Sequence, residues 1–184
     1  MEATLRKFEP ADFDRLVKMY GEFEPKGAFQ GLPPQTLAQI RSWLRMLCET
    51  GDAQFVVETG NRIVGHSMLC VSKDKKDAEF AIFLHQSYRG LGLGKKLTLG
   101  TLNFGCKQLK LERVWLSVQG SNPVALRLFE DVGFRDTTQG EPLRWELEME
   151  RPSHCARCKE DKCIVFGRGL PLVVTLPRRK SVAT

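Results

Sequence analysis

The chain has 184 residues, of which 42% are hydrophobic and 27% are charged, so its length and composition favour one folded domain and exclude wholesale disorder. No apolar run approaches the roughly 18 residues of a membrane-spanning helix, and residues 1–7 lack the apolar stretch of a secretory signal, so we expect a cytoplasmic protein with no membrane partner. The net charge of +6 resides in the last 34 residues, because residues 1–150 contain 20 Lys or Arg and 20 Asp or Glu, and we therefore expect no specific nucleic-acid partner.

The first half of the chain predicts one strand, two helices and then three strands. Pro10 ends the first strand, and Asp12 begins a helix whose apolar residues recur at helical spacing. A loop with three glycines and three prolines, residues 21–34, separates the two helices. In chain order, the expected elements are residues 4–8, 12–20, 34–49, 54–58, 63–71 and 78–84.

The second half predicts a helix and a strand that complete a strand–helix–strand crossover, then another helix and two strands. Asn122 and Pro123 fit the start of the second of these helices, as cap and first-turn proline, and Gly133 fits its end. The expected elements are residues 92–111, 114–118, 122–133, a strand that opens at 134, and 143–150. Hairpins that lead into a crossover predict an α/β fold with a mixed, mostly antiparallel central sheet and flanking helices.

The chain divides into one domain, residues 1–150, and a basic, cysteine-containing C-terminal extension, residues 151–184. Within the extension, residues 163–166 and 172–176 flank a Gly-Pro-containing turn and predict a short hairpin. A hairpin of this size is not stable alone, so it must pack on the domain or on a second subunit of a homodimer.

A glycine-rich segment joins the strand at 78–84 to the following helix. Three alternate glycines and three basic residues lie there: Gly90, Gly92, Gly94, Arg89, Lys95 and Lys96. Glycines let a backbone approach a ligand closely, and a helix N-terminus offers unpaired N–H groups and the positive end of its dipole. The spacing matches neither a P-loop nor a dinucleotide fingerprint, so it predicts either another kind of pyrophosphate site or only a tight turn.

Two motifs, in this order along the chain, resemble the GNAT superfamily of N-acetyltransferases. The coenzyme A motif of that family, Gln/Arg-x-x-Gly-x-Gly/Ala, is matched by Arg89, Gly92 and Gly94. A second signature, Asn-x-x-Ala at a helix start and Gly-Phe at its end, is matched by Asn122, Ala125, Gly133 and Phe134. The resemblance covers roughly residues 3–150, includes the order of strands and helices, and leaves the tail unmatched.

The resemblance implies that the chain binds acetyl-CoA as its cosubstrate and transfers the acetyl group to a primary amine, either a protein lysine or a small amine. Backbone groups of Leu84, His85 and Gln86 would hold the pantetheine arm. The pyrophosphate would be held by the backbone amides of Arg89, Gly90, Leu91, Gly92, Leu93, Gly94 and Lys95. Asn122 would contact the pantetheine or the catalytic region, although a capping role alone also explains it.

Glu79 is the candidate general base. It lies in an otherwise apolar strand, where partial desolvation raises the pKa of a carboxyl group toward a useful range. Residues 78–81 are also similar to the strand of bacterial protein-lysine acetyltransferases in which the matching glutamate is the base. The alternative is that Glu79, close to Asp77, is simply solvated. For His85 as a base and His66 as a substrate contact, a structural role is the favoured interpretation.

The sequence departs from the family at Phe129, where many members have a tyrosine that protonates the leaving thiolate. Phenylalanine cannot donate a proton, so water replaces it or the thiolate leaves unaided, with Tyr88 as the remaining nearby phenol. The alternative function is a non-catalytic acyl-CoA-sensing or regulatory module with a metal- or partner-binding tail. In an enzyme, Glu22 and Glu24 of the loop at 21–34 would attract a cationic amine.

The tail contains a cluster of cysteines with part of a zinc pattern. Cys155 and Cys158 have the C-x-x-C spacing of zinc ligands, and Cys163 follows five residues later. A second C-x-x-C pair is missing, so the fourth ligand would have to be His154, Asp161 or a distant residue. The cluster therefore predicts either a zinc site or free, redox-sensitive thiols.

Overall fold

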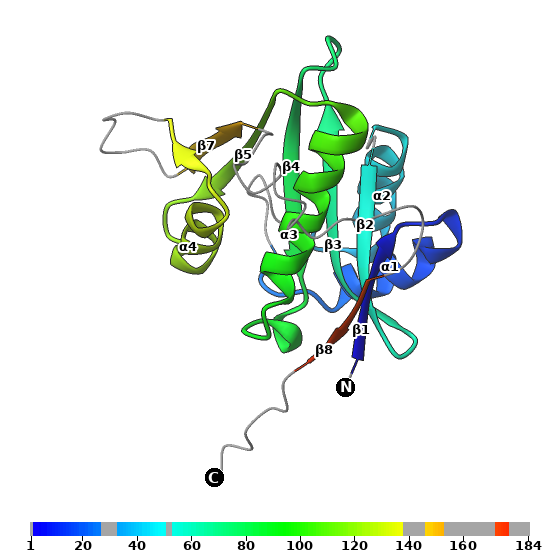
Figure 1. Ribbon diagram of the computed structural model, residues 1–184. Coiled ribbons are helices and arrows are strands. Elements are labelled where there is room, and N and C mark those ends of the chain that lie inside the picture. The colour runs from blue at the N-terminus through cyan, green and yellow to red at the C-terminus, as the bar shows by residue number, and fades with distance from the viewer. Residues whose placement is uncertain (1, 27–32, 51–52, 138–145, 153–171, 177–184) are drawn as a thin grey trace, which may run out of the picture.

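The computed structural model describes residues 2–26, 33–50, 53–137, 146–152 and 172–176. They form one sheet with the strand order β6-β7-β5-β4-β3-β2-β1-β8 and helices on both faces (Figure 1). The strands are β1 (Glu2–Lys7), β2 (Ala53–Thr59), β3 (Arg62–Val71), β4 (Asp77–Leu84), β5 (Arg113–Gln119), β6 (Arg135–Asp136), β7 (Glu146–Pro152) and β8 (Leu172–Thr175). The α-helices are α1 (Phe13–Gly21), α2 (Leu37–Thr50), α3 (Leu93–Phe104) and α4 (Pro123–Asp131).

All strand pairs among the described residues are antiparallel except β4 with β5, which run parallel. This confirms the predicted mixed, mostly antiparallel sheet. The parallel pair follows from the crossover through α3, because a helix must carry the chain back before β5 can run in the direction of β4. No helix in the described part of the chain is both long enough and apolar enough to cross a membrane.

The sheet has a separate hydrophobic core on each face. The first core joins α3 and α4 to sheet residues that include Phe55 and Phe80. The second core joins α1 and α2 to sheet residues that include Val56 and Phe83. Phe55 and Val56 are neighbours in β2 and enter opposite cores, as the alternation of side chains along a strand requires. The two covered faces leave the ends and edges of the strands as the places for chemistry.

The helix predicted over residues 92–111 is shorter in the structure. The α-helix ends at Phe104, a π-helical turn follows over Gly105–Leu109, and Lys110 has a positive φ of 59°. A Cβ atom at Gly105 would lie 2.9 Å from Leu69 Cδ1 and 3.0 Å from Leu111 Cδ1. Gly105 thus allows a close approach to Leu69 of β3 at the point where the regular helix ends, which periodicity alone does not reveal.

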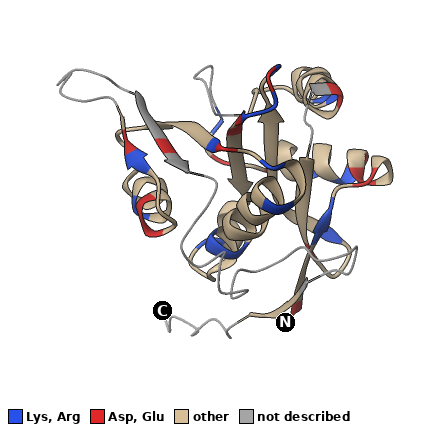
Figure 2. Cartoon of the chain, turned by 45° about the horizontal axis from the view of Figure 1, so that its top comes forward, with Lys and Arg blue, Asp and Glu red and all other residues tan. Residues whose placement is uncertain are grey.

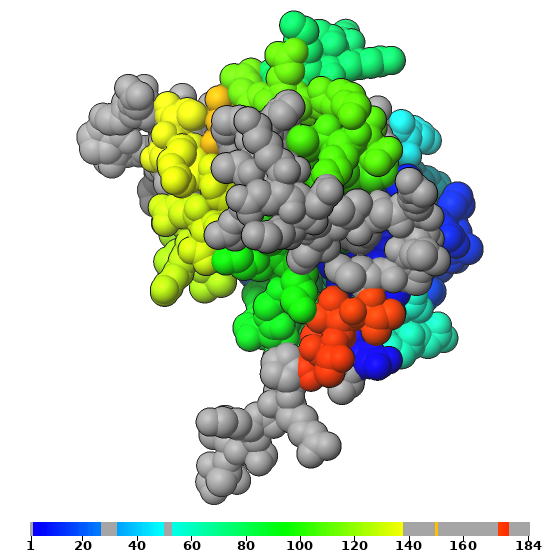
Figure 3. Space-filling view, viewed as in Figure 1, coloured from blue at the N-terminus to red at the C-terminus, as the bar shows by residue number. Residues whose placement is uncertain are grey.

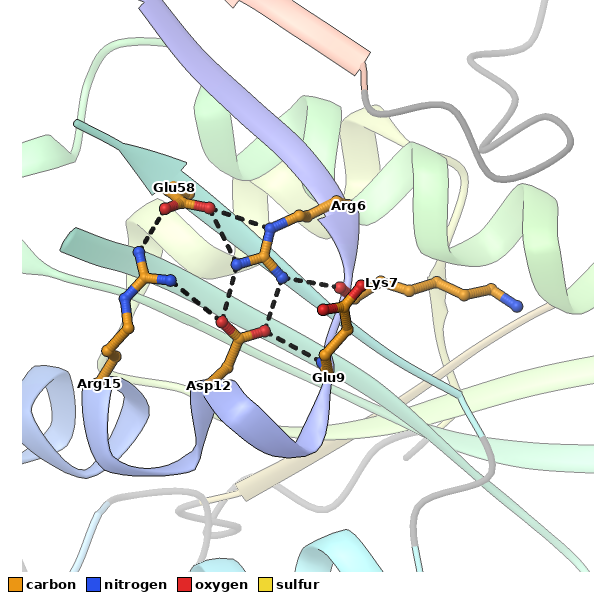
Figure 4. Close-up of polar contacts among 6 residues, drawn as sticks. All are labelled: Arg6, Lys7, Glu9, Asp12, Arg15 and Glu58. Carbon is orange, nitrogen blue, oxygen red and sulfur yellow. Dashed lines mark hydrogen bonds and ion pairs between the residues drawn. The ribbon is translucent and has the colours of Figure 1, made fainter. Parts of the chain in front are cut away.

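Four charged residues join the first elements of the chain (Figure 4). Arg6 makes a two-pronged ion pair with Asp12, with Nη1–Oδ2 and Nη2–Oδ1 distances of 2.6 and 2.7 Å, and its Nε donates to Glu58 at 3.0 Å. Arg15 pairs with the same two carboxylates. The Arg6 guanidinium lowers the pKa of Asp12 from its usual value, so this carboxylate remains charged at neutral pH.

β8 comes from the predicted C-terminal extension and lies at the edge of the sheet beside β1. It pairs antiparallel with β1, from Glu2 opposite Thr175 to Leu5 opposite Leu172, and Figure 3 shows it against the N-terminal strand. The other arm of the predicted hairpin, residues 163–166, lies outside the described residues. The described arm thus packs on the domain, and the homodimer stays a prediction.

Candidate active site

β4 and β5 pair only at their first residues and then separate. Their parallel register runs from Asp77 opposite Arg113 to Glu79 opposite Trp115. Beyond these residues β4 stays paired with β3 up to Leu84, and β5 stays paired with β7 up to Gln119. Figure 1 shows β5 turning away from β4 along this length. The end of β4 therefore has an edge that faces away from β3 and that β5 does not cover.

The backbone of Leu84 lies on that edge. The N–H of His85 donates to the carbonyl of Val64 in β3 at 2.9 Å, so alternation directs the N–H and C=O of Leu84 toward the opposite side. The carbonyl of Leu84 accepts from Arg89 Nε at 3.1 Å. Of the backbone groups predicted to hold pantetheine, the Leu84 N–H is directed toward the uncovered edge, while the His85 N–H belongs to the β3–β4 ladder.

The glycine-rich segment forms the start of α3, as predicted. Gly90 and Gly92 have φ angles of +77° and +76°, which non-glycine residues rarely adopt, and Gly92 is the N-cap of α3. The N–H of Lys96 makes the first hydrogen bond along the helix, to the carbonyl of Gly92 at 3.3 Å. The amides from Leu93 to Lys95 precede this bond and point out of the helix end, which is the arrangement that binds anions.

Two of the three basic side chains of this segment have partners within the protein. The Arg89 guanidinium donates to the backbone carbonyls of Leu84 and Glu24, at 3.1 and 2.7 Å. Lys95 Nζ lies 3.3 Å from Asp131 Oδ2, on an exposed pair. The Arg89 Nε and Nη2 donors thus bind protein carbonyls, and the binding of a pyrophosphate by this segment stays a prediction. The backbone amides are the groups that fit an anion here.

Glu79 is at the last residue pair that β4 and β5 share, where the two strands begin to separate. It is half-buried, and strand alternation places it on the same face as Ala81 and Phe83, which belong to the core under α1 and α2. Its neighbour Asp77 is engaged by Arg113, whose Nη2 lies 2.6 Å from the Asp77 carboxylate. The proposed base thus lies at the point of strand separation. Arg113 also pairs with Glu150 of β7. The sequence did not predict these ion pairs, because both carboxylates lie on strands other than the one that carries Arg113.

The two histidines of this region have structural partners. His66 is fully buried, with Nδ1 2.8 Å from the Tyr20 hydroxyl and Nε2 3.1 Å from Gln54 Oε1. His85 Nδ1 accepts from the Ser87 N–H at 3.2 Å, which leaves the proton on Nε2. Burial lowers the pKa of both rings. These contacts support the structural roles and leave His85 without the free nitrogen that a general base needs.

Asn122 and Phe129 both have roles in holding α4. The Asn122 side chain accepts from the Ala125 N–H at 3.1 Å and thus caps the helix. Phe129, at the position where the family has tyrosine, is 6% exposed and packs against Phe80 and Phe134 with ring centroids 6.3 and 5.7 Å away. Tyr88 lies in the turn after β4 with its ring 6.0 Å from that of His85. At the position where many family members have a tyrosine that protonates the leaving thiolate, this chain therefore has no phenol.

The charges predicted for the acceptor side are only in part available. The Glu22 carboxylate pairs with Arg62, Oε2 to Nη2, at 2.5 Å and lies 3.9 Å from His85 Nε2. Glu24 is exposed. In Figure 2 the acidic and basic residues of the described elements are interspersed. Of the two glutamates predicted to attract an amine, Glu22 is therefore partly neutralised by an arginine.

The predicted zinc ligands Cys155, Cys158 and Cys163 lie outside the described residues. Within the described ranges, no group of three or more His, Cys, Asp or Glu residues could hold a metal ion. The zinc hypothesis for the tail therefore stays a prediction.

Residues 2–135 match a family model described as the acetyltransferase (GNAT) domain. Among curated proteins, the chain is 31% identical over 104 residues to an uncharacterized prophage-derived N-acetyltransferase, YokL, of Bacillus subtilis, covering 55% of this chain and 58% of that one. It is 32% identical over 135 residues to a mycothiol acetyltransferase of Thermomonospora curvata, covering 71% of this chain but 43% of that one. It is 25% identical over 143 residues to a spermidine N(1)-acetyltransferase of Vibrio cholerae, covering 72% and 79%. The chain thus spans less than two thirds of the first two relatives.

Solved structures share the fold at lower identity. An acetyltransferase of the GNAT family from Streptococcus pneumoniae superposes with a TM-score of 0.66 at 18% identity, covering 82% of this chain and 98% of that one. A variant of the spermidine N-acetyltransferase from Vibrio cholerae superposes with a TM-score of 0.64 at 20% identity, covering 85% and 96%. At these identities the likeness concerns the fold alone.

Proposed function

The chain belongs to the GNAT family of acetyltransferases, and on that premise we propose that it transfers an acetyl group from acetyl-CoA to a primary amine. The observation that carries the proposal is the end of β4. There, a strand edge uncovered by β5 leads directly into two left-handed glycines and the free amides at the start of α3. This arrangement fits a ligand with an extended polar arm and a pyrophosphate.

Coenzyme binding would divide between the strand edge and the helix start. The Leu84 backbone would hold the polar arm, as one more strand holds an edge, and the amides from Leu93 to Lys95 would hold the pyrophosphate. Acetyl-CoA supplies the activated acetyl group as a thioester. The Leu84 N–H is the donor that we assign to the developing oxyanion, which leaves the Leu84 carbonyl to accept a hydrogen bond from the polar arm.

Glu79 would remove the proton that the acceptor must lose. An alkyl amine has a pKa of about 10.4 and is almost wholly protonated at neutral pH, whereas only the neutral amine is a nucleophile. A carboxylate at the point where β4 and β5 separate would accept this proton, directly or through one water. With Phe129 in the core, the leaving thiolate would take a proton from water, or leave unprotonated.

Small amines are the first class of acceptor that we propose, because one relative with most of its length covered is named a spermidine N(1)-acetyltransferase. A protein lysine is the second class, carried only by the strand around Glu79. Both present the same alkyl ammonium group to the base, so one assay covers them.

The test is an amine panel with purified protein and acetyl-CoA, read by the release of free thiol. Spermidine, shorter diamines and a lysine peptide are offered in turn, and at least one is expected to give turnover. Glu79→Gln should lower kcat by roughly a hundredfold or more while the Kd for coenzyme A stays unchanged. Glu49→Gln, an exposed glutamate at the end of α2, serves as the matched control and should behave as wild type. Equal kcat values for Glu79→Gln and wild type would remove Glu79 from the mechanism.

A second candidate function is acyl-CoA binding without turnover. The observation that favours it is Phe129, which fills a core position between Phe80 and Phe134 and supplies no proton donor. Tight binding of coenzyme A with no thiol release on any amine of the panel would select this function over the enzyme.

A further inference from the structure

Two side chains from residues 84–95, the segment proposed to bind coenzyme A, make hydrogen bonds to the backbone of a distant loop. Gln86 and Arg89 lie in the turn that follows β4, and their partners are Glu22 and Glu24, in the connection that follows α1. We call these four residues the clamp.

Gln86 uses both ends of its amide in the clamp. Its Oε1 accepts from the N–H of Glu24 at 3.1 Å, and its Nε2 donates to the carbonyl of Glu22 at 2.8 Å. One side chain therefore bonds a backbone donor and a backbone acceptor of the loop, as a neighbouring strand would. The contact depends on an amide, because a carboxylate can supply only the acceptor and an amine only the donor.

Arg89 binds both the end of β4 and the loop that follows α1. Its Nη2 donates to the carbonyl of Glu24 at 2.7 Å, and its Nε donates to the carbonyl of Leu84 at the end of β4 at 3.1 Å. Its guanidinium carbon lies 5.3 Å from the ring centroid of Phe23, which is 5% exposed. A planar group with several donors thus joins the end of β4 to the loop, which a lysine cannot do in the same way.

The clamped loop lies on the face of the sheet that carries the proposed base. The rings of Phe23 and Phe83 are 6.0 Å apart, and Phe83 is on the same face of β4 as Glu79. Phe83 is four positions along the strand from Glu79, a distance of about 13 Å. The clamp therefore links the end of β4, where the acyl donor would bind, to a loop on the acceptor side.

We propose that Gln86 and Arg89 are positioning residues, which hold the loop at Glu22–Glu24 against the end of β4 so that the acceptor amine meets the acyl donor in register. The proposal rests on the proposed acetyltransferase function. It assigns the Arg89 side chain to the acceptor side of the reaction and leaves anion binding to the backbone amides of α3. Small misplacements of a reacting group cost about a hundredfold in rate, so a loosened loop is expected to have an effect of that order.

The kinetic test compares Gln86→Leu and Arg89→Met with wild type. Each replacement keeps most of the side-chain volume and removes the hydrogen bonds. We expect kcat/KM for the amine to fall by roughly 10- to 100-fold in both, while the Kd for coenzyme A changes by less than about threefold. Arg89→Lys should recover part of the loss. The exposed residues Gln108 and Arg41 offer matched controls, Gln108→Leu and Arg41→Met, which should behave as wild type.

Hydrogen exchange provides a readout that does not need turnover. In wild type, coenzyme A is expected to slow exchange of the amides in residues 22–26, because the clamp connects them to the end of β4. In Gln86→Leu and Arg89→Met, exchange there should be faster and no longer respond to coenzyme A.

Two outcomes would overturn the clamp. One is a loss of more than about tenfold in coenzyme A affinity in Arg89→Met with unchanged exchange at 22–26, which makes Arg89 a ligand of the pyrophosphate. The other is wild-type exchange in both variants. If wild type binds coenzyme A but turns over no amine, the proposed function fails, while the exchange experiment still decides whether the clamp exists.

Discussion

His66 forms a buried hydrogen-bond chain in which each proton can be assigned. Gln54 Oε1 is only an acceptor, so His66 Nε2 carries the proton toward it and Nδ1 accepts from the Tyr20 hydroxyl. Gln54 Nε2 in turn donates a hydrogen bond to the carbonyl of Leu47 at 3.0 Å. The ring is fully buried, and burial lowers its pKa from 6.5 to about 3. A histidine satisfied in this way stabilises the core under α1 and α2 in its neutral form.

This burial predicts a stability that falls on acidification. Well above pH 6.5 the ring is neutral in both states, whereas between pH 6.5 and about pH 3 the unfolded chain binds a proton that the folded chain excludes. The contribution of His66 to the free energy of unfolding should fall by up to about 1.4 kcal/mol for each pH unit across this window. In His66→Gln, which keeps one donor and one acceptor, the fall between about pH 6.5 and pH 4.5 should be smaller by about 2 kcal/mol.

Urea denaturation at several pH values measures both curves. His66→Gln is expected to be less stable than wild type at neutral pH by roughly 1–3 kcal/mol, because it alters the geometry of the hydrogen bonds to Tyr20 and Gln54. The remaining titratable groups are common to both proteins, so the difference between the curves isolates His66. Parallel curves would show that the ring titrates normally.

At the scale of elements, the starts of α3 and α4 differ in whether their first backbone amides are bonded by a side chain. α3 begins at a left-handed glycine that leaves its first amides free, whereas α4 begins at an asparagine that occupies the Ala125 amide. The first start is suited to a ligand and the second is closed by its own side chain. The residue at the cap thus makes the two helix starts differ: Gly92 has no side chain to bond the first amides of α3, whereas Asn122 bonds an amide of α4.

Asn122→Ala tests the structural assignment of the second start. Loss of the cap should lower the free energy of unfolding by about 1 kcal/mol, and Asn122→Ser, which retains a capping oxygen, should lose less than half of that. Chemical denaturation of the three proteins gives the comparison. Equal losses in both variants would mean that the Ala125 contact is not what Asn122 contributes.

At the scale of the whole molecule, the sheet is completed at its β1 edge by a strand from the end of the chain. Val174 and Leu176 enter the first core, at 5% and 3% exposure, together with Ala3 and Leu5 of β1. Val173, the residue before Val174, is 55% exposed. Without β8, the six residues of β1 would form the edge of the described sheet. β8 presents only four residues there, and a short edge strand limits association with other chains.

Val174→Asp and Val173→Asp test this role as a matched pair. The first places a charge in the core and should detach β8, lowering the free energy of unfolding by roughly 2–4 kcal/mol. The second faces solvent on the same strand and should cost about 1 kcal/mol or less. Denaturation measures the loss, and light scattering after gel filtration measures association, which is expected only in Val174→Asp. Similar losses in the free energy of unfolding of the two variants would contradict the packing of β8 beside β1 of the same chain.

Much of the fold follows from patterns that are local in the sequence. The strands expected at 54–58 and 63–71 and the Asn-Pro start at 122 each depend on a few consecutive residues, and the structure has elements at all of these places. The crossover through α3 predicted the parallel pair of β4 with β5. The end of α3 was wrong by several residues, because the closeness of Gly105 to Leu69 depends on a strand that lies far away in the chain.

The sequence by itself determined the family, the mixed sheet and the glycine turn at the start of α3, because period, turn residues and motif spacing express backbone geometry directly. Only the tertiary structure decided what the charged and polar side chains do. Arg89 and Glu24 are 65 residues apart, and Gln86 and Glu22 are 64 residues apart, yet they form the clamp. The pairing of β8 with β1 is likewise a choice among distant partners. A side chain binds whatever folding brings within reach, and that depends on the packing of the whole chain rather than on its neighbours in sequence.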